Sequence, residues 1–309
     1  MSAPGSSVIR AGNVRKSYGE VRAVDGISFE VARGDVFGLL GPNGAGKTTT
    51  VEMLEGLRQP DDGTLEVLGI DVSRDPDALK ERIGVALQTA ELYPKLTVVE
   101  VLDLFRSFYR RSLPTEQLIS FLDLGERRNA QTRQLSGGQR QRLAVALALV
   151  NDPEVVFLDE PTTGLDPAAR RALWTLVEQL RDRGTTVLLT THYMEEAETL
   201  CDQVAIMDHG RILDMGTVPQ LVSRRFREKA VQFDRIAGLD DERLTAIAAV
   251  SSVRHDDGEV LLYSRDVPAT IQDLLAVTDA MGAEPQNLTI RRATLEDVFL
   301  ELTGRAMRD

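Results

Sequence analysis

The stretch GPNGAGKTTT, residues 41–50, has the residue types and spacing of a loop that wraps phosphate groups. Its glycines let the backbone approach a ligand closely, so that backbone N–H groups can point at the phosphates. Lys47 is spaced to reach the outer phosphates, and the Thr48 hydroxyl is spaced to hold Mg²⁺. The residues predicted to contact a nucleotide are Gly41, Pro42, Asn43, Gly44, Ala45, Gly46, Lys47, Thr48 and Thr49.

The segments on either side of this loop have the pattern that such a loop requires. The apolar run VFGLL, residues 36–40, predicts a buried strand, and TTTVEMLEGL after the loop predicts a helix. A glycine-rich surface turn is the alternative interpretation, but it does not call for this order of strand, loop and helix. The sequence therefore predicts nucleotide binding.

Two adjacent carboxylates follow a second apolar run, VVFLDEP, at the predicted end of a strand. Like charges this close repel each other unless a cation lies near them, and a bound Mg²⁺ would supply that charge. Asp159 would then be a metal ligand, directly or through water, and Glu160 would orient and deprotonate an attacking water. Two solvated loop acids are the alternative, which a phosphate loop in the same chain disfavours.

Three further polar or aromatic side chains lie at the ends of predicted elements, where they could face a ligand. His192 closes the run TTVLLTTH, where it could contact a γ-phosphate, although a lone histidine at such a position is more often structural. Gln88 follows the run IGVAL, and its position alone assigns it no role. Tyr18 in KSYGE could stack on an adenine or could be an ordinary exposed loop residue.

The pentamer LSGGQ, Leu135 to Gln139, precedes a long apolar helical run. Ser136 is a suitable N-cap, and Gly137 and Gly138 would let the backbone come close to a ligand. The N–H groups of a first helical turn favour phosphate. The residues alone leave open which phosphate this would be.

The elements that position these residues are read from apolar periodicity. Residues 8–31 predict an antiparallel sheet with turns at YGE and VDG, and residues 98–134 predict helices. Alternating strands and helices after residue 152 predict a parallel sheet in an α/β core. After residue 226 the order β-α-β-β-α-β and a last helix predict a small α+β, ferredoxin-like domain. The expected organisation is a tail, 1–7, a main domain, 8–225, with helices in about 90–150, and an accessory domain, 226–309.

Composition restricts the classes of function. The 309 residues carry a formal net charge of −12, which argues against a protein that grips a nucleic-acid backbone. The single cysteine, Cys201, excludes an internal disulfide and is typical of the cytoplasm. No run reaches the ~18 apolar residues of a membrane span, and we expect no signal peptide. Any membrane role is therefore expected to come from a partner.

Taken together, the motifs between residues 8 and 222 resemble the ATP-binding subunits of ABC transporters. The resemblance implies an ABC-type P-loop ATPase core with antiparallel β and helical subdomains, and it implies ATP and Mg²⁺ as ligands. It implies that Tyr18 stacks on adenine, that Gln88 senses the metal and faces a membrane partner, and that His192 is a switch residue. It further assigns Asp166 in GLD to a dimer loop and LSGGQ to the γ-phosphate held by a second subunit.

The resemblance also implies partners and a direction of transport. A homodimer would complete two ATP sites, and a heterodimer with a sister subunit stays open. LYPKLTVVEVL and LEDVFLELTGR are similar to the subgroup that serves daunorubicin-resistance-type exporters of drugs, antibiotics and other hydrophobic compounds. We therefore expect a peripheral subunit on the cytoplasmic face of the plasma membrane, bound to a permease on a separate chain. An importer ATPase and a soluble machine acting on ribosomes or DNA are the alternatives.

Overall fold

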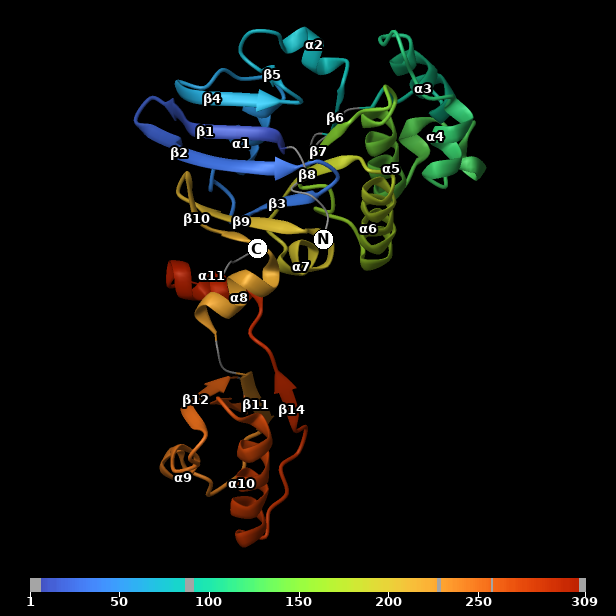
Figure 1. Cartoon of the computed structure of the whole chain (residues 1–309). Helices are drawn as coiled ribbons and strands as arrows, with labels where there is room; N and C mark the ends of the chain where they lie inside the picture. Colours follow the sequence, from blue (N-terminus) through green and yellow to red (C-terminus); the bar gives the residue numbers. More distant parts are fainter. Residues whose placement is uncertain (1–6, 87–91, 227–228, 257, 306–309) are drawn as a thin grey trace. The chain divides into compact units, whose positions relative to one another are not determined.

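The computed structural model describes residues 7–86, 92–226, 229–256 and 258–305 (Figure 1). The chain divides into two compact units, one made mainly of residues 1–218 and one of residues 219–306. The second unit thus begins earlier than residue 226, because helix α8 (Val218–Arg225) is grouped with it.

An antiparallel sheet lies in the first unit, as predicted for residues 8–31. Its strands, in spatial order, are β2 (Val21–Ala32), β1 (Ser7–Tyr18), β4 (Asp62–Val67) and β5 (Ile70–Asp71). The predicted turn at YGE joins β1 to β2, but the turn predicted at VDG is wrong. Gly26 lies inside β2 with φ of 77°, beside irregularities in the β1–β2 register. A bulge therefore uses the glycine that the sequence suggested for a turn.

The second sheet of this unit carries the predicted site. Its strands, in spatial order, are β10 (Arg211–Gly216), β9 (Gln203–Asp208), β3 (Val36–Leu40), β8 (Thr186–Thr191), β7 (Val155–Asp159) and β6 (Ile83–Ala86). All neighbours are parallel except β9 and β10. Every residue of β3, β7 and β8 is buried, as expected for parallel strands covered on both faces. The predicted α/β core is confirmed.

Parallel pairing places the carboxyl ends of these strands at one edge of the sheet. β3 ends directly before the loop at residue 41, β7 ends at Asp159, and β8 ends directly before His192. Helices α1 (Lys47–Leu54), α2 (Pro76–Lys80), α6 (Pro167–Asp182) and α7 (Met194–Leu200) connect the strands. Residues far apart in sequence therefore meet at this edge.

The helical part of the unit consists of α3 (Val98–Arg106), α4 (Thr115–Phe121) and α5 (Gly137–Ala148), with 3₁₀ turns Gly125–Arg127 and Thr132–Gln134. Val98, Val101 and Leu102 are fully buried, as their spacing predicts. Phe108 is 63% exposed, because α3 ends two residues before it and the helical periodicity no longer applies.

The second unit contains a four-stranded antiparallel sheet. The spatial order is β12 (Val250–Asp256), β13 (Glu259–Ser264), β11 (Lys229–Asp234) and β14 (Thr289–Arg291). The helices α9 (Asp241–Thr245) and α10 (Val267–Ala280) follow β11 and β13 in the chain, and α11 (Leu295–Thr303) follows β14. Leu244 and Leu274 of α9 and α10 pack with Val231 and Phe233 of the sheet. Chain order and sheet order together agree with the ferredoxin-like arrangement expected from the sequence.

Candidate active site

The phosphate loop runs from the end of β3 into α1, and two of its glycines are required by the protein itself. Gly46 precedes α1 with φ of 101°, and a Cβ there would lie 2.2 Å from the Ala23 carbonyl oxygen. A Cβ on Gly41 would lie 2.1 Å from the Met207 carbonyl oxygen. The backbone at both positions is therefore packed too closely against β2 and β9 for any side chain.

The loop forms the floor of an open pocket of about 610 Å³. The predicted residues that line it are Tyr18, Asn43, Gly44, Gly46, Lys47, Thr48, Thr49 and Glu160. Val21, Arg22, Ala23 and His209 line it as well, and none of them was predicted. His209 lies in the β9–β10 turn with φ of 45°, and contacts between distant segments, among them the parallel pairing of β9 with β3, bring it here. Local sequence carried no signal for it.

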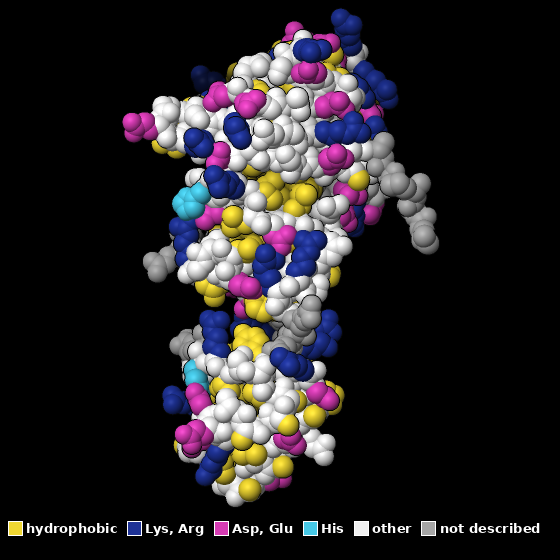
Figure 2. All heavy atoms as spheres, turned by 60° about the vertical axis from the view of Figure 1, so that its left-hand side comes forward, with side chains coloured by type: hydrophobic (Ala, Val, Ile, Leu, Met, Phe, Trp, Pro, Cys, Tyr) yellow, Lys and Arg dark blue, Asp and Glu magenta, His cyan; other side chains and the backbone are white. Residues whose placement is uncertain are grey.

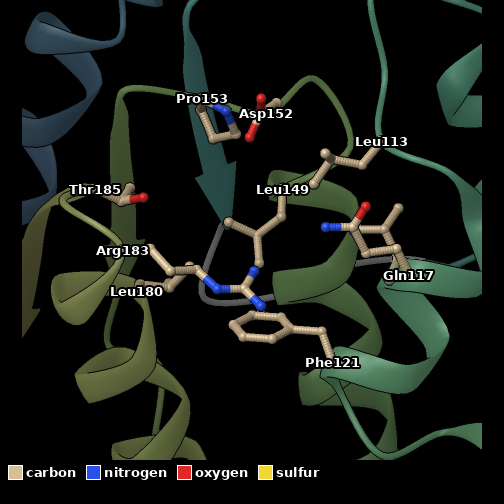
Figure 3. Close-up of a pocket in the computed structure, with 10 residues that line it drawn as sticks. Leu113, Gln117, Phe121, Leu149, Asp152, Pro153, Leu180, Arg183 and Thr185 are labelled. Carbon is tan, nitrogen blue, oxygen red and sulfur yellow. The ribbon is translucent and has the colours of Figure 1, made fainter.

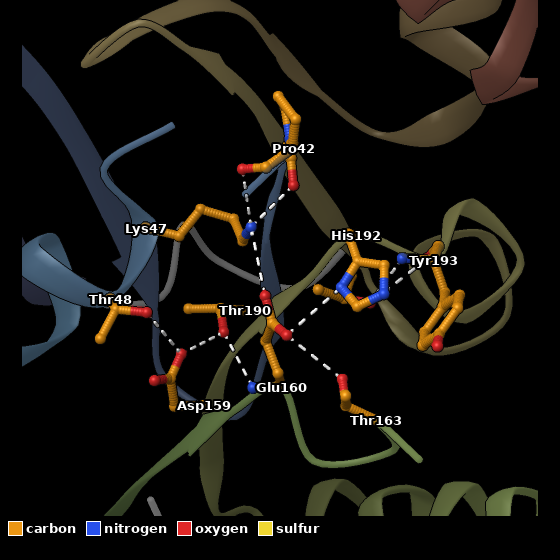
Figure 4. Close-up of polar contacts among 11 residues, drawn as sticks. Pro42, Lys47, Thr48, Asp159, Glu160, Thr163, Thr190, His192 and Tyr193 are labelled. Carbon is orange, nitrogen blue, oxygen red and sulfur yellow. Dashed lines mark hydrogen bonds and ion pairs between the residues drawn. The ribbon is translucent and has the colours of Figure 1, made fainter. Parts of the chain in front are cut away.

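Lys47 is buried beneath this pocket and makes several polar contacts (Figure 4). Its Nζ donates to the carbonyl oxygens of Gly41, at 2.7 Å, and Pro42, at 3.1 Å, and lies 3.4 Å from Oε1 of Glu160. Burial lowers the pKa of the ammonium, while the charges of Glu160 and Asp159 oppose that shift. An anionic phosphate in the pocket would further stabilise the charged form of this buried lysine.

Asp159 and Thr48 form a pair of oxygen donors that suits Mg²⁺. Thr48 Oγ1 lies 3.3 Å from Oδ1 of Asp159, which also accepts a hydrogen bond of 2.5 Å from Thr190. Burial raises the pKa of Asp159, and the charge of Glu160 adds to the rise, so a cation here would relieve both effects. Among the described residues, no group of three or more His, Cys, Asp or Glu side chains has an arrangement that could hold a metal ion. Besides protein oxygens, a magnesium ion here would take ligands from phosphate and water, as it usually does.

Glu160 lies at the centre of the site. Its φ of 45° is uncommon for a residue with a side chain, and its backbone N–H donates to Thr190 Oγ1 at 2.9 Å. Backbone strain of this kind persists only where the surrounding structure holds it, and it is found most often at functional positions. Oε1 faces Lys47, while Oε2 lies 3.3 Å from Nδ1 of His192 and accepts a bond of 3.2 Å from Thr163 (Figure 4). The carboxylate is therefore held in place and can act as a general base.

The pentamer LSGGQ forms a capped helix start on another part of the surface. Ser136 Oγ accepts from Gln139 N–H at 3.2 Å, and the Gln139 side chain accepts from Ser136 N–H at 3.0 Å. Ser136 and Gly137 are exposed, and residues 135–139 are not among the described residues that line the pocket. Asp166 caps α6 and is also exposed. Gln88 lies outside the described residues.

Glu55 is a buried carboxyl group near the site that the sequence did not single out. It is 2% exposed, and its Oε2 has no hydrogen-bond partner among the described residues. It lines an apolar groove of about 300 Å³ with Phe105 and Tyr109. Burial raises the pKa of Glu55 to about 8, and the charges of Asp159 and Glu52 add to this effect.

We expect Glu55→Gln to remove a pH dependence of stability. Because the folded state holds its proton more tightly than the unfolded state, the parent loses stability as the pH rises from about 4.5 to about 8. The variant lacks this loss, so its advantage should grow to on the order of 4 kcal/mol near pH 8 and vanish below pH 4.5. Thermal melting at pH 5 and pH 8 measures the difference. Glu81→Gln, at an exposed position, is the control, and equal pH dependence in parent and Glu55→Gln would contradict the prediction.

A separate cavity lies between α4 and the ends of α5 and α6 (Figure 3). Its volume is about 100 Å³, and the Arg183 guanidinium carbon lies 4.0 Å from the Phe121 ring centroid on its wall. None of the predicted site residues is among the described residues that line it. The cavity therefore stands apart from the phosphate site.

The whole chain is similar to known ATP-binding proteins. A family profile described as ABC transporter matches residues 24–163. A Nod factor export ATP-binding protein I of Ralstonia nicotianae is 42% identical, over 98% of this chain and 95% of the relative. A linearmycin resistance ATP-binding protein of Bacillus subtilis is 35% identical, over 98% and 100%. A daunorubicin resistance ATP-binding protein of Streptomyces coeruleorubidus is 40% identical, over 96% and 96%.

Solved structures give the same result for the fold. An ATP-binding cassette of an ABC transporter in its ADP conformation has a TM-score of 0.62 at 27% identity, covering 69% of this chain and 92% of that chain. A dimeric post-hydrolysis cassette bound to ADP and Pi has a TM-score of 0.62 at 28% identity, covering 68% and 98%.

In the part of the chain that the structure describes, no helix is long and apolar enough to cross a membrane.

Proposed function

The chain belongs to the family of ATP-binding subunits of ABC transporters, and from this premise we propose that it hydrolyses Mg²⁺-ATP to power an exporter. The position of Glu160 is the observation that carries the catalytic part of this proposal. Its carboxylate lies between the phosphate-loop lysine, at 3.4 Å, and His192, at 3.3 Å, at the pocket that the phosphate loop forms. Replacement of Glu160, described in the Discussion, is the experiment that tests it.

Each step assigned to the protein follows from a side chain in the pocket. Tyr18 would stack on the adenine, since it is 41% exposed and lines the pocket. Lys47 and the N–H groups of the loop would hold the phosphates, and Thr48, Asp159 and Gln88 would hold the metal, which supplies positive charge for the developing transition state. Glu160 would accept the proton of the attacking water, and His192 would contact the γ-phosphate.

A second copy of the chain is part of this proposal. Ser136 and Gly137 are exposed at a helix N-terminus, where a phosphate held by another subunit would find N–H donors. Twofold symmetry would give two complete sites and leave neither half unused. The solved dimeric cassette bound to ADP and Pi supports dimerisation as the working state.

The transported compound is proposed from the names of relatives. They export a Nod factor or give resistance to linearmycin and daunorubicin. We infer that this chain serves export of a hydrophobic compound through a permease on a separate chain, and that it lies at the cytoplasmic face of the plasma membrane. Acidic and basic side chains are interspersed over the face of the first unit in Figure 2, which supports the expectation that nucleic acid is not a partner.

A chain that ends at Val218 is expected to fold and to bind ATP with nearly the parental affinity. The residues that we assign to nucleotide contact lie before residue 210, and the first unit has its own buried cores. Dimerisation or coupling to the permease should weaken instead. The accessory unit contains none of the residues assigned to nucleotide contact, so we expect it to serve contacts between subunits. Nucleotide titration and ATP-dependent dimerisation of the shortened and full chains measure both effects. Loss of ATP binding in a shortened chain that is folded by circular dichroism would contradict this division.

A further inference from the structure

A group of buried polar side chains surrounds Glu196, beside the segment that carries His192, and connects three parts of the site. Glu196, on α7, is 1% exposed, and its Oε1 accepts a hydrogen bond of 3.1 Å from Trp174 Nε1 on α6. Thr162, two residues after Glu160, is also 1% exposed. The group therefore joins the segment after the proposed base, the helix after the dimer loop and the helix after His192.

Several atoms of this group lack ordinary partners. Glu196 Oε2, Thr162 Oγ1 and Arg170 Nε are buried and have no hydrogen bond within the described part of the chain. Burial raises the pKa of Glu196, and the nearby Thr191, Thr162, Trp174 and Arg170 side chains oppose the rise only in part. Burying a carboxyl costs stability unless its neighbours hold it, so the contacts of Glu196 with Trp174 and the surrounding side chains decide where the carboxyl lies.

Aromatic contacts connect the same group to His192. The Arg170 guanidinium carbon lies 4.6 Å from the Tyr193 ring centroid, and that ring lies 4.1 Å from the His192 ring. Tyr193 N–H donates to Thr191 Oγ1 at 2.9 Å, which fixes the backbone between the two rings. Arg170 and Trp174 are four residues apart on α6 and so share one face. This face of α6 therefore contacts the segment after His192 at two points, which are Tyr193 before α7 and Glu196 within α7.

The beginning of α6 is itself fixed by other motifs. Asp166 caps it by accepting from Ala168 and Ala169 N–H at 3.0 and 2.9 Å. A Cβ on Gly138 of LSGGQ would lie 2.7 Å from Cβ of Ala169, so α5 and α6 approach closely at this glycine. The helix that holds the His192 loop is thus anchored where the proposed dimer contacts lie.

We propose that Glu196 is a positioning residue for ATP hydrolysis, which with Trp174 and Arg170 holds the loop that carries His192 against α6. It acts through His192, whose Nδ1 lies 3.3 Å from Glu160, and it does not touch substrate. The inference rests on the assignment of His192 and Glu160 to hydrolysis made under the proposed function. A role confined to stability would not depend on His192.

The test is a double-mutant cycle on the full chain. We expect Glu196→Ala to lower kcat for ATP about tenfold, with the KM for ATP close to parental, as is typical of coupled neighbours. Glu196→Gln should recover most of the rate, because an amide oxygen can still accept from Trp174. In a His192→Ala background, Glu196→Ala should cause no further loss. Glu195→Ala, at the preceding exposed position of α7, is the matched control and should keep the parental rate.

Trp174→Phe keeps the aromatic packing and removes only the indole N–H, so it is the second variant if Glu196→Ala fails to fold. Its smaller loss of kcat should likewise disappear in the His192→Ala background. An equal fold-loss in both backgrounds, for either variant, overturns the inference and leaves the proposed function intact. A parental rate for His192→Ala alone overturns the assignment of His192, and the inference with it.

Discussion

Glu160→Gln is expected to lower ATP hydrolysis by at least the ~10²-fold typical of losing a general base, with ATP binding retained. The amide keeps the size of the carboxylate and can still meet Lys47 and Thr163, which lie 3.4 and 3.2 Å from the two oxygens. It cannot accept a proton from water at neutral pH. The variant should therefore accumulate an ATP-bound dimer, because the bound nucleotide is no longer consumed.

Single-turnover hydrolysis and size-exclusion chromatography with ATP measure the two parts of this prediction. Glu195→Gln is the matched control, because it makes the same chemical change at an exposed glutamate of the same unit. Hydrolysis by Glu160→Gln at the parental rate would show that another group accepts the proton. Loss of ATP binding would instead assign Glu160 to the pocket's structure, through its contacts with Lys47 and His192.

The local patterns of the sequence were enough to predict the parts of the fold that position the chemistry. The run before residue 41 and the run before Asp159 are buried parallel strands, because continuous apolar runs of this length have few other uses in an α/β protein. The accessory unit was predictable for a related reason. Its strands and helices alternate with clear turn residues, and the observed sheet order follows from their chain order.

The rest of the site depends on contacts between distant segments, which periodicity does not report. Glu160 has a left-handed backbone, at φ of 45°, and its N–H donates to Thr190 on another strand, a contact that local sequence does not reveal. His209 reaches the pocket because β9 pairs with β3 and because the turn that carries it bonds to Asp25 and Ala45. Glu196 reads as an ordinary polar residue near the start of a helix, although the fold buries it against Trp174 of α6. Gly26 marked a turn by composition, but the register of β1 and β2 uses it in a bulge.

The separation of LSGGQ from the phosphate pocket leads to the prediction that the two halves of a site act in trans. Lys47→Ala removes the ammonium that faces the phosphates, and Ser136→Arg places a bulky side chain at the exposed start of α5. Each variant should be inactive as a homodimer, because each of its two sites carries one lesion. A mixed dimer places both lesions in one site and leaves the other site unaltered.

Mixing the two inactive variants should therefore restore turnover. Random pairing makes half of the dimers mixed, and each has one of two sites intact, so the expected recovery is up to about a quarter of the parental rate. Each variant incubated alone under the same conditions is the control. If both sites have to act together, turnover stays low but nucleotide occupancy still recovers, because occupancy needs only one complete site.

A photoreactive group on the γ-phosphate of an ATP analogue identifies the chain that supplies Ser136. With chains of two different lengths, the analogue held by the Lys47 of one chain should label the LSGGQ segment of the other. We expect labelling across the dimer because residues 135–139 are not among the described residues that line the pocket of their own chain. Labelling confined to the chain that holds the nucleotide would overturn the arrangement in trans, and the exposed start of α5 would then need a different partner.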